Sequence, residues 1–364
     1  MSKPISSESS LFSHQETREL LDWFSRCGID YPWGDNPTPY RVWISEIMLQ
    51  QTVVTAAVGH FNRWMDLFPD VESLAAADEQ SVLKAWEGLG YYSRARNLRK
   101  GAVYLMEQHG GNLPDEYRQL LKVPGIGDYT ARALLSLAFG KPWPVLDANV
   151  RRIAQRLLAR REWEKTDDLS LMESLETRIP EESPGLFNCA LMQLGQQVCR
   201  VRTPDCESCP LKRSCRSRER ELQGEIPAPK KRKISEKSSV LLLLISDGRI
   251  LMTRREKGIG QGLWFLPAFP EGREEELSGE LMHPEHGEAA DSMILRERVH
   301  LYTSWKETLK PRIFFLKDHT DKIPEWMGPE GDRSRWIDLD TIDEYPTASV
   351  YRKILEDIPS LFLS

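Results

Sequence analysis

The sequence lacks any long apolar run. None of its 364 residues belongs to a stretch approaching the roughly 18 consecutive apolar residues that a membrane-spanning helix requires. The longest run, around Val240 to Ile245, suits a buried strand. The first ten residues are polar and lack the basic start and apolar segment of a secretory signal peptide. We therefore expect a cytoplasmic protein that makes no contact with a membrane.

The chain also lacks an excess of positive charge. Its formal net charge is -6, which taken alone argues weakly against nucleic-acid binding. The charges are nevertheless unevenly distributed: residues 271–288 are strongly acidic, whereas basic residues gather between positions 200 and 220. These basic residues are Arg200, Arg202, Lys212, Arg213, Arg216, Arg218 and Arg220. Because a basic surface can coexist with an acidic remainder, the net charge excludes little.

Cysteine is scarce, and most of it lies in one place. Of six cysteines, four occur as Cys199, Cys206, Cys209 and Cys215, separated by six, two and five residues. In a reducing compartment such a group favours metal binding over disulfides. Zinc sites usually take their ligands as two close pairs, and only one close pair exists here. The spacing therefore favours a structural [4Fe-4S] cluster over zinc. Outside this group, Cys27 and Cys189 are expected to be core residues.

The length and the patterning predict more than one domain. Helical periodicity dominates the first two thirds, and Pro39 is expected to open a helix. Further helices are predicted at 72–87, 93–109, 114–122, 129–139 and 148–160. A segment rich in glycine, proline and basic residues predicts a linker at 222–238. Beyond it, strands at 239–245 and 250–253 flank a turn, with further strands at 300–305 and 313–316 and a helix at 347–355. We thus expect a mainly α domain over 1–221 and an α+β domain over 239–364.

A glycine turn joins two of the predicted helices. Gly125 and Gly127 lead directly into the helix at 129–139. Glycines permit close backbone approach, and the free amides at a helix start point toward an anion. This arrangement could hold a DNA phosphate. The same glycines are equally compatible with an ordinary helix pair.

Two carboxylates have ordinary explanations when taken singly. Asp147 precedes a predicted helix, where aspartate is a common N-cap. Glu46 lies in mid-helix beside Ile47 and Met48, and burial there would raise its pKa. An exposed helix position would explain Glu46 equally well.

Taken together, the motifs resemble a known family. They include Trp-Ile-Ser-Glu-Ile-Met-Leu-Gln-Gln-Thr at 43–52, Gly-Leu-Gly-Tyr-Tyr at 88–92, the glycine turn, Pro-Val-Leu-Asp at 144–147 and the four-cysteine loop. In this order they are similar to the helix-hairpin-helix DNA glycosylases of the iron–sulfur branch, and among these to the adenine glycosylases of the MutY family. The resemblance is strong over residues 20–220. It implies a helix-hairpin-helix glycosylase fold with an iron–sulfur loop, followed by a Nudix-like α+β domain.

The resemblance also implies a reaction and roles for individual residues. The enzyme would be a monomer in the bacterial cytosol that hydrolyses the glycosidic bond of adenine mispaired with 8-oxoguanine or guanine in double-stranded DNA. Glu46 would protonate the leaving base and then handle the water, and Asp147 would stabilise the positive sugar. Asn149 and Tyr129 would orient these groups. Because Tyr129 stands where lyase relatives carry a nucleophilic lysine, a monofunctional enzyme is expected.

Contacts to DNA and to the cluster are implied in the same way. The four cysteines of the loop would be the cluster ligands. The DNA-contacting residues would be Trp33, Gln50, Gln51, Thr52, Leu89, Gly90, Tyr91, Gly125, Gly127, Thr303 and Ser304.

Several positions depart from the family pattern. Gly34 replaces the usual arginine, and Ala148 replaces a glycine in a manner typical of thymine mismatch glycosylases. The C-terminal region lacks the metal-binding Nudix motif, so pyrophosphatase activity is not expected. Its segment 301–305 lacks the histidine of the family's Phe-Ser-His loop, although Thr303 could replace the serine. Two alternatives therefore stay open: a thymine glycosylase acting on T:G mispairs, and a lesion-binding protein with weakened catalysis.

Overall fold

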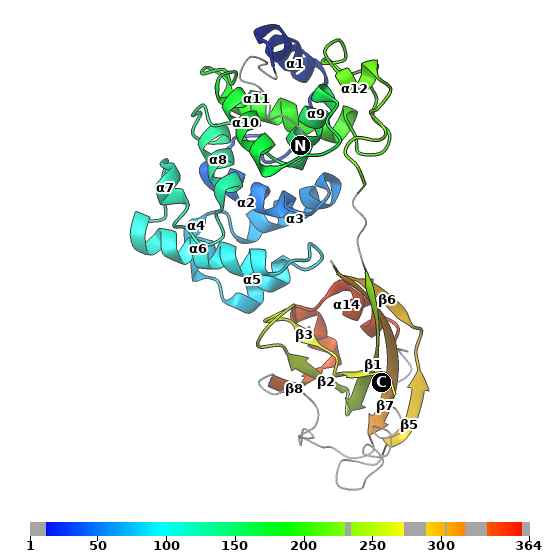
Figure 1. Ribbon diagram of the computed structural model, residues 1–364. Helices are drawn as coiled ribbons and strands as arrows, with labels where there is room; N and C mark the ends of the chain where they lie inside the picture. The colour runs from blue at the N-terminus through cyan, green and yellow to red at the C-terminus, as the bar shows by residue number, and fades with distance from the viewer. Residues whose placement is uncertain (1–11, 230–233, 273–288, 303, 317–332, 359–364) are drawn as a thin grey trace. The chain divides into compact units, whose positions relative to one another are not determined.

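A computed structural model describes residues 12–229, 234–272, 289–302, 304–316 and 333–358 (Figure 1). The chain divides into two compact units. The first contains residues 1–75 and 100–231, and the second contains residues 76–99 and 232–364. Within the described ranges, no helix is long and apolar enough to cross a membrane.

The first unit is helical. Its helices are α1 (His14–Cys27), α2 (Pro39–Leu49), α3 (Val54–Leu67), α7 (Tyr117–Leu120), α8 (Asp128–Leu137), α9 (Ala148–Leu158), α10 (Lys165–Glu176), α11 (Pro184–Gln193), the π-helical turn η1 (Leu194–Val198) and α12 (Arg216–Glu219). Two others, α4 (Val71–Ala76) and α6 (Ser93–His109), run across a boundary between the units.

Local signals explain where several helices begin. The prediction that Pro39 opens a helix is confirmed: Pro39 is the first residue of α2, and the Thr38 side chain caps it by accepting the Arg41 amide. The single helix predicted at 72–87 is wrong, because the structure has α4 and then α5 (Glu79–Ala85). Asp78 separates them, since its side chain accepts the amides of Gln80 and Ser81 as the N-cap of α5. The helix predicted at 114–122 is likewise shortened to α7.

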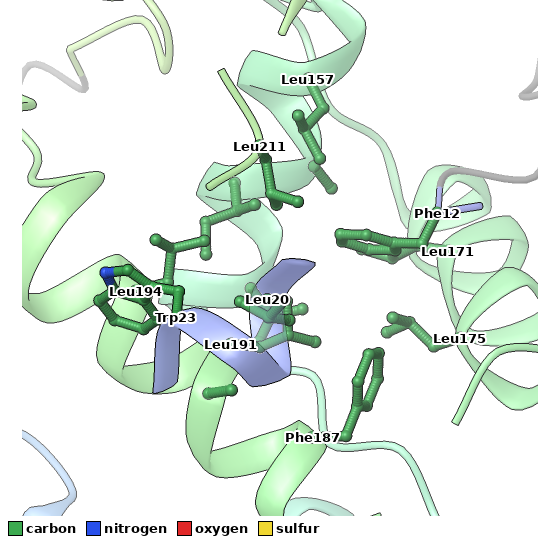
Figure 2. Close-up of a cluster of buried hydrophobic side chains, with 14 of the residues drawn as sticks. Phe12, Leu20, Trp23, Leu157, Leu171, Leu175, Phe187, Leu191, Leu194 and Leu211 are labelled. Carbon is green, nitrogen blue, oxygen red and sulfur yellow. The ribbon is translucent and has the colours of Figure 1, made fainter. Parts of the chain in front are cut away.

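One core of the first unit joins segments that are distant in sequence. Phe12 and Leu20 from the N-terminal segment meet α9, α10, α11 and the loop after Cys199 (Figure 2). Its labelled side chains are Phe12, Leu20, Trp23, Leu157, Leu171, Leu175, Phe187, Leu191, Leu194 and Leu211. Cys199, Cys209 and Cys215 pack against this cluster. The cysteine loop is therefore anchored on the same apolar core as the helix that begins after Asp147.

In its described residues the second unit is built on an eight-stranded mixed sheet, which fits the predicted α+β fold. Its elements are α5, the first turns of α6, β1 (Ser235–Ser246), β2 (Arg249–Arg254), β3 (Trp264–Phe265), β4 (Ala268–Pro270), β5 (Ala289–Ile294), β6 (Arg298–Leu301), β7 (Trp305–Leu316), β8 (Arg333–Asp338), η3 (Leu339–Glu344) and α14 (Ser349–Leu355). Strand β1 pairs parallel with β7 and antiparallel with β2, in the order β3-β2-β1-β7-β5.

The turn predicted between the first two strands is confirmed. Asp247 and Gly248 have positive φ values of 55° and 67°, which suits the tight connection of a twisted hairpin. The strands predicted at 300–305 and 313–316 are wrong in their bounds. Strand β6 ends at Leu301, and β7 runs unbroken from Trp305 to Leu316 because it pairs with β1 over its length.

A candidate active site on four helices

Glu46 is a buried acid on α2. Its side chain is 5% exposed, and the residues around it from Val42 to Met48 are all buried. Burial raises the pKa of the Glu46 carboxyl to about 7. A hydrogen bond with the Tyr129 hydroxyl partly opposes this pKa shift, and the nearby Asp147 carboxylate adds to it. Glu46 is thus a carboxyl group that can still hold its proton near neutral pH.

Tyr129 connects α8 to this acid. Its hydroxyl hydrogen-bonds with Glu46 and lies 3.5 Å from Met192 Sδ on α11. Burial raises the pKa of Tyr129 well above its ordinary value, and the carboxylates of Glu46 and Asp147 raise it further. The phenol therefore stays neutral and acts as a hydrogen-bonding group between α8, α2 and α11.

Asp147 begins α9, as the sequence predicted for an N-cap. Its Oδ1 accepts the amide of Val150 at 2.7 Å, and its Oδ2 accepts Asn149 Nδ2 at 2.7 Å. On the other side of the amide, Asn149 Oδ1 accepts Arg152 Nη2 at 2.9 Å. The structure thus brings together Glu46, Tyr129, Asp147 and Asn149, the four residues predicted to be catalytic.

Three neighbours of this site were not predicted to belong to it. Cys189 was expected in the core, and burial raises the pKa of its thiol to about 12, but the Glu46 carboxylate is close enough to contribute to that shift. Met192 lies one helical turn further along α11. Arg152 is 6% exposed, and its Nε donates to the carbonyl of Cys199 at 2.8 Å. Only the i, i+3 spacing of Asn149 and Arg152 could have been seen in the sequence.

The four clustered cysteines lie near one another. None of them forms a disulfide. Burial raises the pKa of the Cys209 thiol to about 12, and Cys199, Cys206 and Cys215 all lie close enough to raise it further. Across the described part of the chain, no three His, Cys, Asp or Glu residues are close enough together to hold a single metal ion.

A buried arginine lies beside these cysteines. Arg156 is 2% exposed, and its Nη1 donates to the sulfur of Cys199 at 3.3 Å. Nη1 also donates to the carbonyl of Arg200 at 2.6 Å, while Nη2 donates to that of Val201 at 2.9 Å and Nε to that of Ile226 at 2.7 Å. Within the described ranges no carboxylate forms an ion pair with Arg156. A buried cation needs a counter-charge, and thiolates or an anionic centre would supply it. This donor set is compatible with a cysteine-ligated cluster.

The predicted hairpin is present. Helix α7 leads through Gly125 to α8, whose N-cap is Gly127. Gly125 has φ +86°, the left-handed conformation that favours glycine. A Cβ on Gly127 would meet no atom within 4 Å, and both glycines are exposed. The amides at the start of α8 are therefore accessible to an anion such as a phosphate.

Comparison with known proteins assigns both parts of the chain. Residues 44–181 match the HhH-GPD superfamily of base excision DNA repair proteins, and residues 240–357 match the NUDIX domain. The adenine DNA glycosylase of Buchnera aphidicola subsp. Acyrthosiphon pisum is 35% identical over 267 residues, which cover 71% of this chain and 75% of the relative. The adenine DNA glycosylase of Rattus norvegicus is 38% identical over 224 residues, or 58% of this chain and 43% of that protein.

The chain belongs to the adenine DNA glycosylase family. The resemblance seen in the sequence is thereby confirmed, as is the expectation of a DNA glycosylase of base excision repair. Among solved structures, a thermostable thymine-DNA glycosylase aligns with a TM-score of 0.52 at 26% identity, covering 56% of this chain and 95% of that one. A non-covalent endonuclease III–DNA complex aligns with a TM-score of 0.50 at 24% identity, covering 58% and 99%. The latter supports the fold alone.

In this adenine glycosylase family member, the segment predicted to probe DNA after α2 has an unusual backbone. Gln51 is exposed and has φ +60°, a conformation that non-glycine residues rarely adopt. Gln50 is half-buried, and its Nε2 donates to the hydroxyl of Thr130 at 3.3 Å. Thr52 is half-buried beside it. Trp33 stacks on Tyr31 with ring centroids 5.0 Å apart. The exposed Gln51 is the member of this group best presented to a ligand.

The glycosylase's other predicted probe has a similar backbone. Tyr91 has φ +49° and is 51% exposed, whereas Leu89 is 6% exposed. Gly90 has φ +68°, and its carbonyl accepts Trp86 Nε1 at 3.0 Å. Arg94 was not among the predicted site residues, and its guanidinium donates to the carbonyls of Leu89 and Gly90 at 3.0 and 3.1 Å. The loop is thus held from inside, with Tyr91 at its surface.

Two of the predicted DNA contacts, Thr303 and Ser304, precede β7 in the sequence. Thr303 lies outside the described residues. Ser304 is exposed, and its carbonyl accepts the Ser235 amide at 3.2 Å. Beside it, Tyr302 stacks on Trp305 with ring centroids 4.4 Å apart.

Proposed function

We propose that this glycosylase removes adenine paired with guanine or 8-oxoguanine from duplex DNA. The observation that carries the proposal is Glu46, a buried carboxyl with a pKa raised to about 7, beside the Asp147 carboxylate. Glycosidic bond hydrolysis needs an acid that is protonated near neutral pH and a second, ionised carboxylate. The adenine specificity is carried over from the relatives.

In the proposed reaction Glu46 donates its proton to the five-membered ring of the adenine. The bond between base and sugar then breaks, and its electron pair leaves with the base. The Asp147 carboxylate stabilises the positive sugar, held in place by Asn149. Water attacks the sugar carbon and gives its proton to the Glu46 carboxylate, which restores the acid. Tyr129 keeps Glu46 oriented through its hydroxyl. The base must first leave the helix stack, and a mispair lowers the cost of that step.

Tyr129 also supports a monofunctional enzyme. A Schiff base with the sugar requires an amine nitrogen, and the phenol of Tyr129 has none. We therefore expect an abasic site as the product, with the DNA strand left intact until alkali is added.

We further propose that Cys199, Cys206, Cys209 and Cys215 hold a [4Fe-4S] cluster. Such a group would supply covalent cross-links that fix the 199–215 loop on its core. The close approach of the four thiols and the buried Arg156 beside them support this assignment. The purified protein is expected to be yellow-brown with about four irons per chain. Colourless protein containing one zinc per chain would overturn it.

The function is tested with three duplexes that carry A:8-oxoguanine, A:G or T:G. Under single-turnover conditions, alkali should reveal cleavage of the adenine strand in the first two. Glu46→Gln and Asp147→Asn should each abolish this cleavage while leaving duplex binding measurable. Tight binding without base release by the unaltered protein would instead support the lesion-binding alternative. Absence of adenine release would sink the proposal.

One observation favours a second candidate, a thymine glycosylase for T:G mispairs. The Asp147-Ala148-Asn149 sequence is typical of that activity, and a thymine-DNA glycosylase is among the similar solved structures at 26% identity. Preferential cleavage of the T:G duplex would select this candidate. The mechanism at Asp147 would be the same, because the sugar carries the same charge when either base leaves.

A further inference from the structure

The helix that leads to the first clustered cysteine ends in a π-helical turn. Helix α11 continues as η1, and the amide of Cys199 donates to the carbonyl of Leu194 at 2.7 Å, five residues back. A π turn contains one residue more than an α turn, and such turns are frequent at functional sites. Here the turn carries buried Gly195.

Gly195 touches Asn149. A Cβ built on Gly195 would lie 2.4 Å from Asn149 Cβ, 3.0 Å from its Cγ and 3.1 Å from its Oδ1. The φ angle of Gly195 lies outside the left-handed region, so its backbone would permit any residue. The contact with Asn149, rather than the backbone, is therefore what excludes a side chain at this position.

Arg152 fixes the same amide from another direction. Its Nη2 donates to Asn149 Oδ1 at 2.9 Å and to the carbonyl of Gly195 at 2.8 Å. A guanidinium can only donate, so the oxygen of the Asn149 amide must face Arg152. The nitrogen of the amide then faces Asp147, to which it donates at 2.7 Å. The Asn149 amide therefore has one orientation. That orientation requires the Cβ of Asn149 to stay in its place against Gly195.

We propose that Gly195 is a positioning residue for Asp147. The π turn places the side-chain-free surface of Gly195 against Asn149, and this contact holds the amide where it donates to the Asp147 carboxylate. The inference rests on the proposed role of Asp147 in stabilising the cationic sugar. A methyl group at Gly195 would displace Asn149 and with it Asp147. Misplacement of a catalytic group by about 1 Å can cost on the order of 10²-fold in rate.

The test measures binding to an analogue of the charged sugar. One duplex carries a cationic azasugar at the target position, and a second carries an uncharged tetrahydrofuran. We expect Gly195→Ala to weaken binding of the azasugar duplex by at least about tenfold, and binding of the tetrahydrofuran duplex by less than about twofold. The control Gly59→Ala lies on the exposed side of α3, where the nearest atom to its Cβ would be Arg63 Nη1 at 3.7 Å. It should change neither affinity.

A second variant isolates the contact itself. Asn149→Gly removes the Cβ that Gly195→Ala would strike, so adding Gly195→Ala to this background should cause no further loss. Any of three results would overturn the proposal. Gly195→Ala could weaken binding of both duplexes equally, or leave the affinity for the azasugar duplex unchanged. It could also cause its full loss of azasugar affinity when added to the Asn149→Gly background. If Gly195→Ala alone does not fold, a folded double variant supports the contact and an unfolded one refutes it.

These measurements are separable from the function. Binding of the azasugar requires neither base cleavage nor a particular base. If the unaltered protein binds both duplexes equally, the proposed role of Asp147 fails. If it prefers the azasugar and Gly195→Ala keeps that preference, only the role of Gly195 fails.

Discussion

The Glu46 carboxyl determines how the reaction should respond to pH. Its pKa is raised to about 7 by burial, so the protonated acid is abundant below pH 7 and is lost above it. Base release under single-turnover conditions should therefore fall by about tenfold per pH unit above pH 7. The binding of uncleaved duplex, measured across the same pH range, separates this effect from altered affinity. A release rate that stays constant from pH 6 to pH 9 would contradict the acid role of Glu46.

The same carboxyl should lower the stability of the fold as the pH rises. With a raised pKa, Glu46 keeps its proton in the folded protein while it ionises in the unfolded chain. Its contribution to stability is thus present below its ordinary value of 4.5 and is lost as the pH rises through about 7. Glutamine does not ionise, so Glu46→Gln removes this pH-dependent loss of stability. The substitution should raise the free energy of unfolding by on the order of 2–3 kcal/mol at pH 8, and by much less at pH 5. Denaturant unfolding at both pH values measures this free energy. Equal effects at pH 5 and pH 8 would count against ionisation as the cause.

Single residues at the site differed in how well the sequence revealed them. Asp147 carries a local signal, because a helix cap lies beside the helix it caps. The hydrogen bonds of Arg152 to the carbonyls of Gly195 and Cys199 span 43 and 47 residues, and no spacing rule predicts such pairs. The thiol of Cys189 was correctly expected to be buried, but burial alone did not show that it lies near Glu46. The same expectation was wrong for Cys27, which is exposed near the end of α1.

At the scale of an element, α9 ends in a residue with a strained backbone conformation, and a substitution can relieve this strain. Its C-cap Ala159 has φ 54° and ψ 39°, the left-handed conformation. This conformation costs a residue with a Cβ about 1 kcal/mol or more, and glycine much less. Ala159→Gly should therefore increase the free energy of unfolding by about 1 kcal/mol.

A matched variant on the same helix should act in the opposite direction. Ala154 lies in the middle of α9 and is fully buried. Ala154→Gly should lower the free energy of unfolding by about 1 kcal/mol, because glycine is a poor helix former and leaves a void. Denaturant unfolding of both variants gives the comparison. If Ala159→Gly destabilised the protein as much as Ala154→Gly, the strain at the cap would be refuted.

Elements with local causes were predictable, and those that depend on distant partners were not. Helix α6 occupies the predicted residues 93–109, because its periodicity is continuous. The break at Asp78 was missed, since apolar residues continue on both sides of this cap. The length of β7 was underestimated because residues 305–312 alternate little, and their pairing with β1 comes from a strand about 70 residues earlier.

At the scale of the whole molecule, the second unit joins a helical segment to the C-terminal residues through polar contacts. Glu87 and Arg352 form an ion pair of 3.0 Å whose side chains are only 16% and 15% exposed. Trp264 Nε1 donates to Gln80 Oε1 at 2.8 Å, and Gln80 Nε2 donates to the carbonyl of Gly262 at 2.9 Å. Nothing in the local composition of residues 76–99 indicated such partners.

Loss of the shielded ion pair should loosen this segment. Arg352→Gln leaves Glu87 without that partner, so amide hydrogen exchange over residues 79–92 should rise by about tenfold or more, since breaking a largely buried pair costs a few kcal/mol. Arg298→Gln is the control, because Arg298 pairs with Asp357 inside the C-terminal residues. Equal amide exchange over residues 79–92 in the two variants would show that the Glu87–Arg352 ion pair does not hold this segment to the C-terminal residues.

The discontinuity of the second unit affects how the protein is made. Gln80 emerges from the ribosome about 180 residues before Gly262 and Trp264. At roughly 5–20 residues per second, translation leaves the segment without those partners for about 10–35 s. Its buried Trp86 and Leu83 are candidates for chaperone binding during that interval. Slow codons placed between residues 99 and 232 would lengthen the wait, and the yield of folded enzyme should decline accordingly.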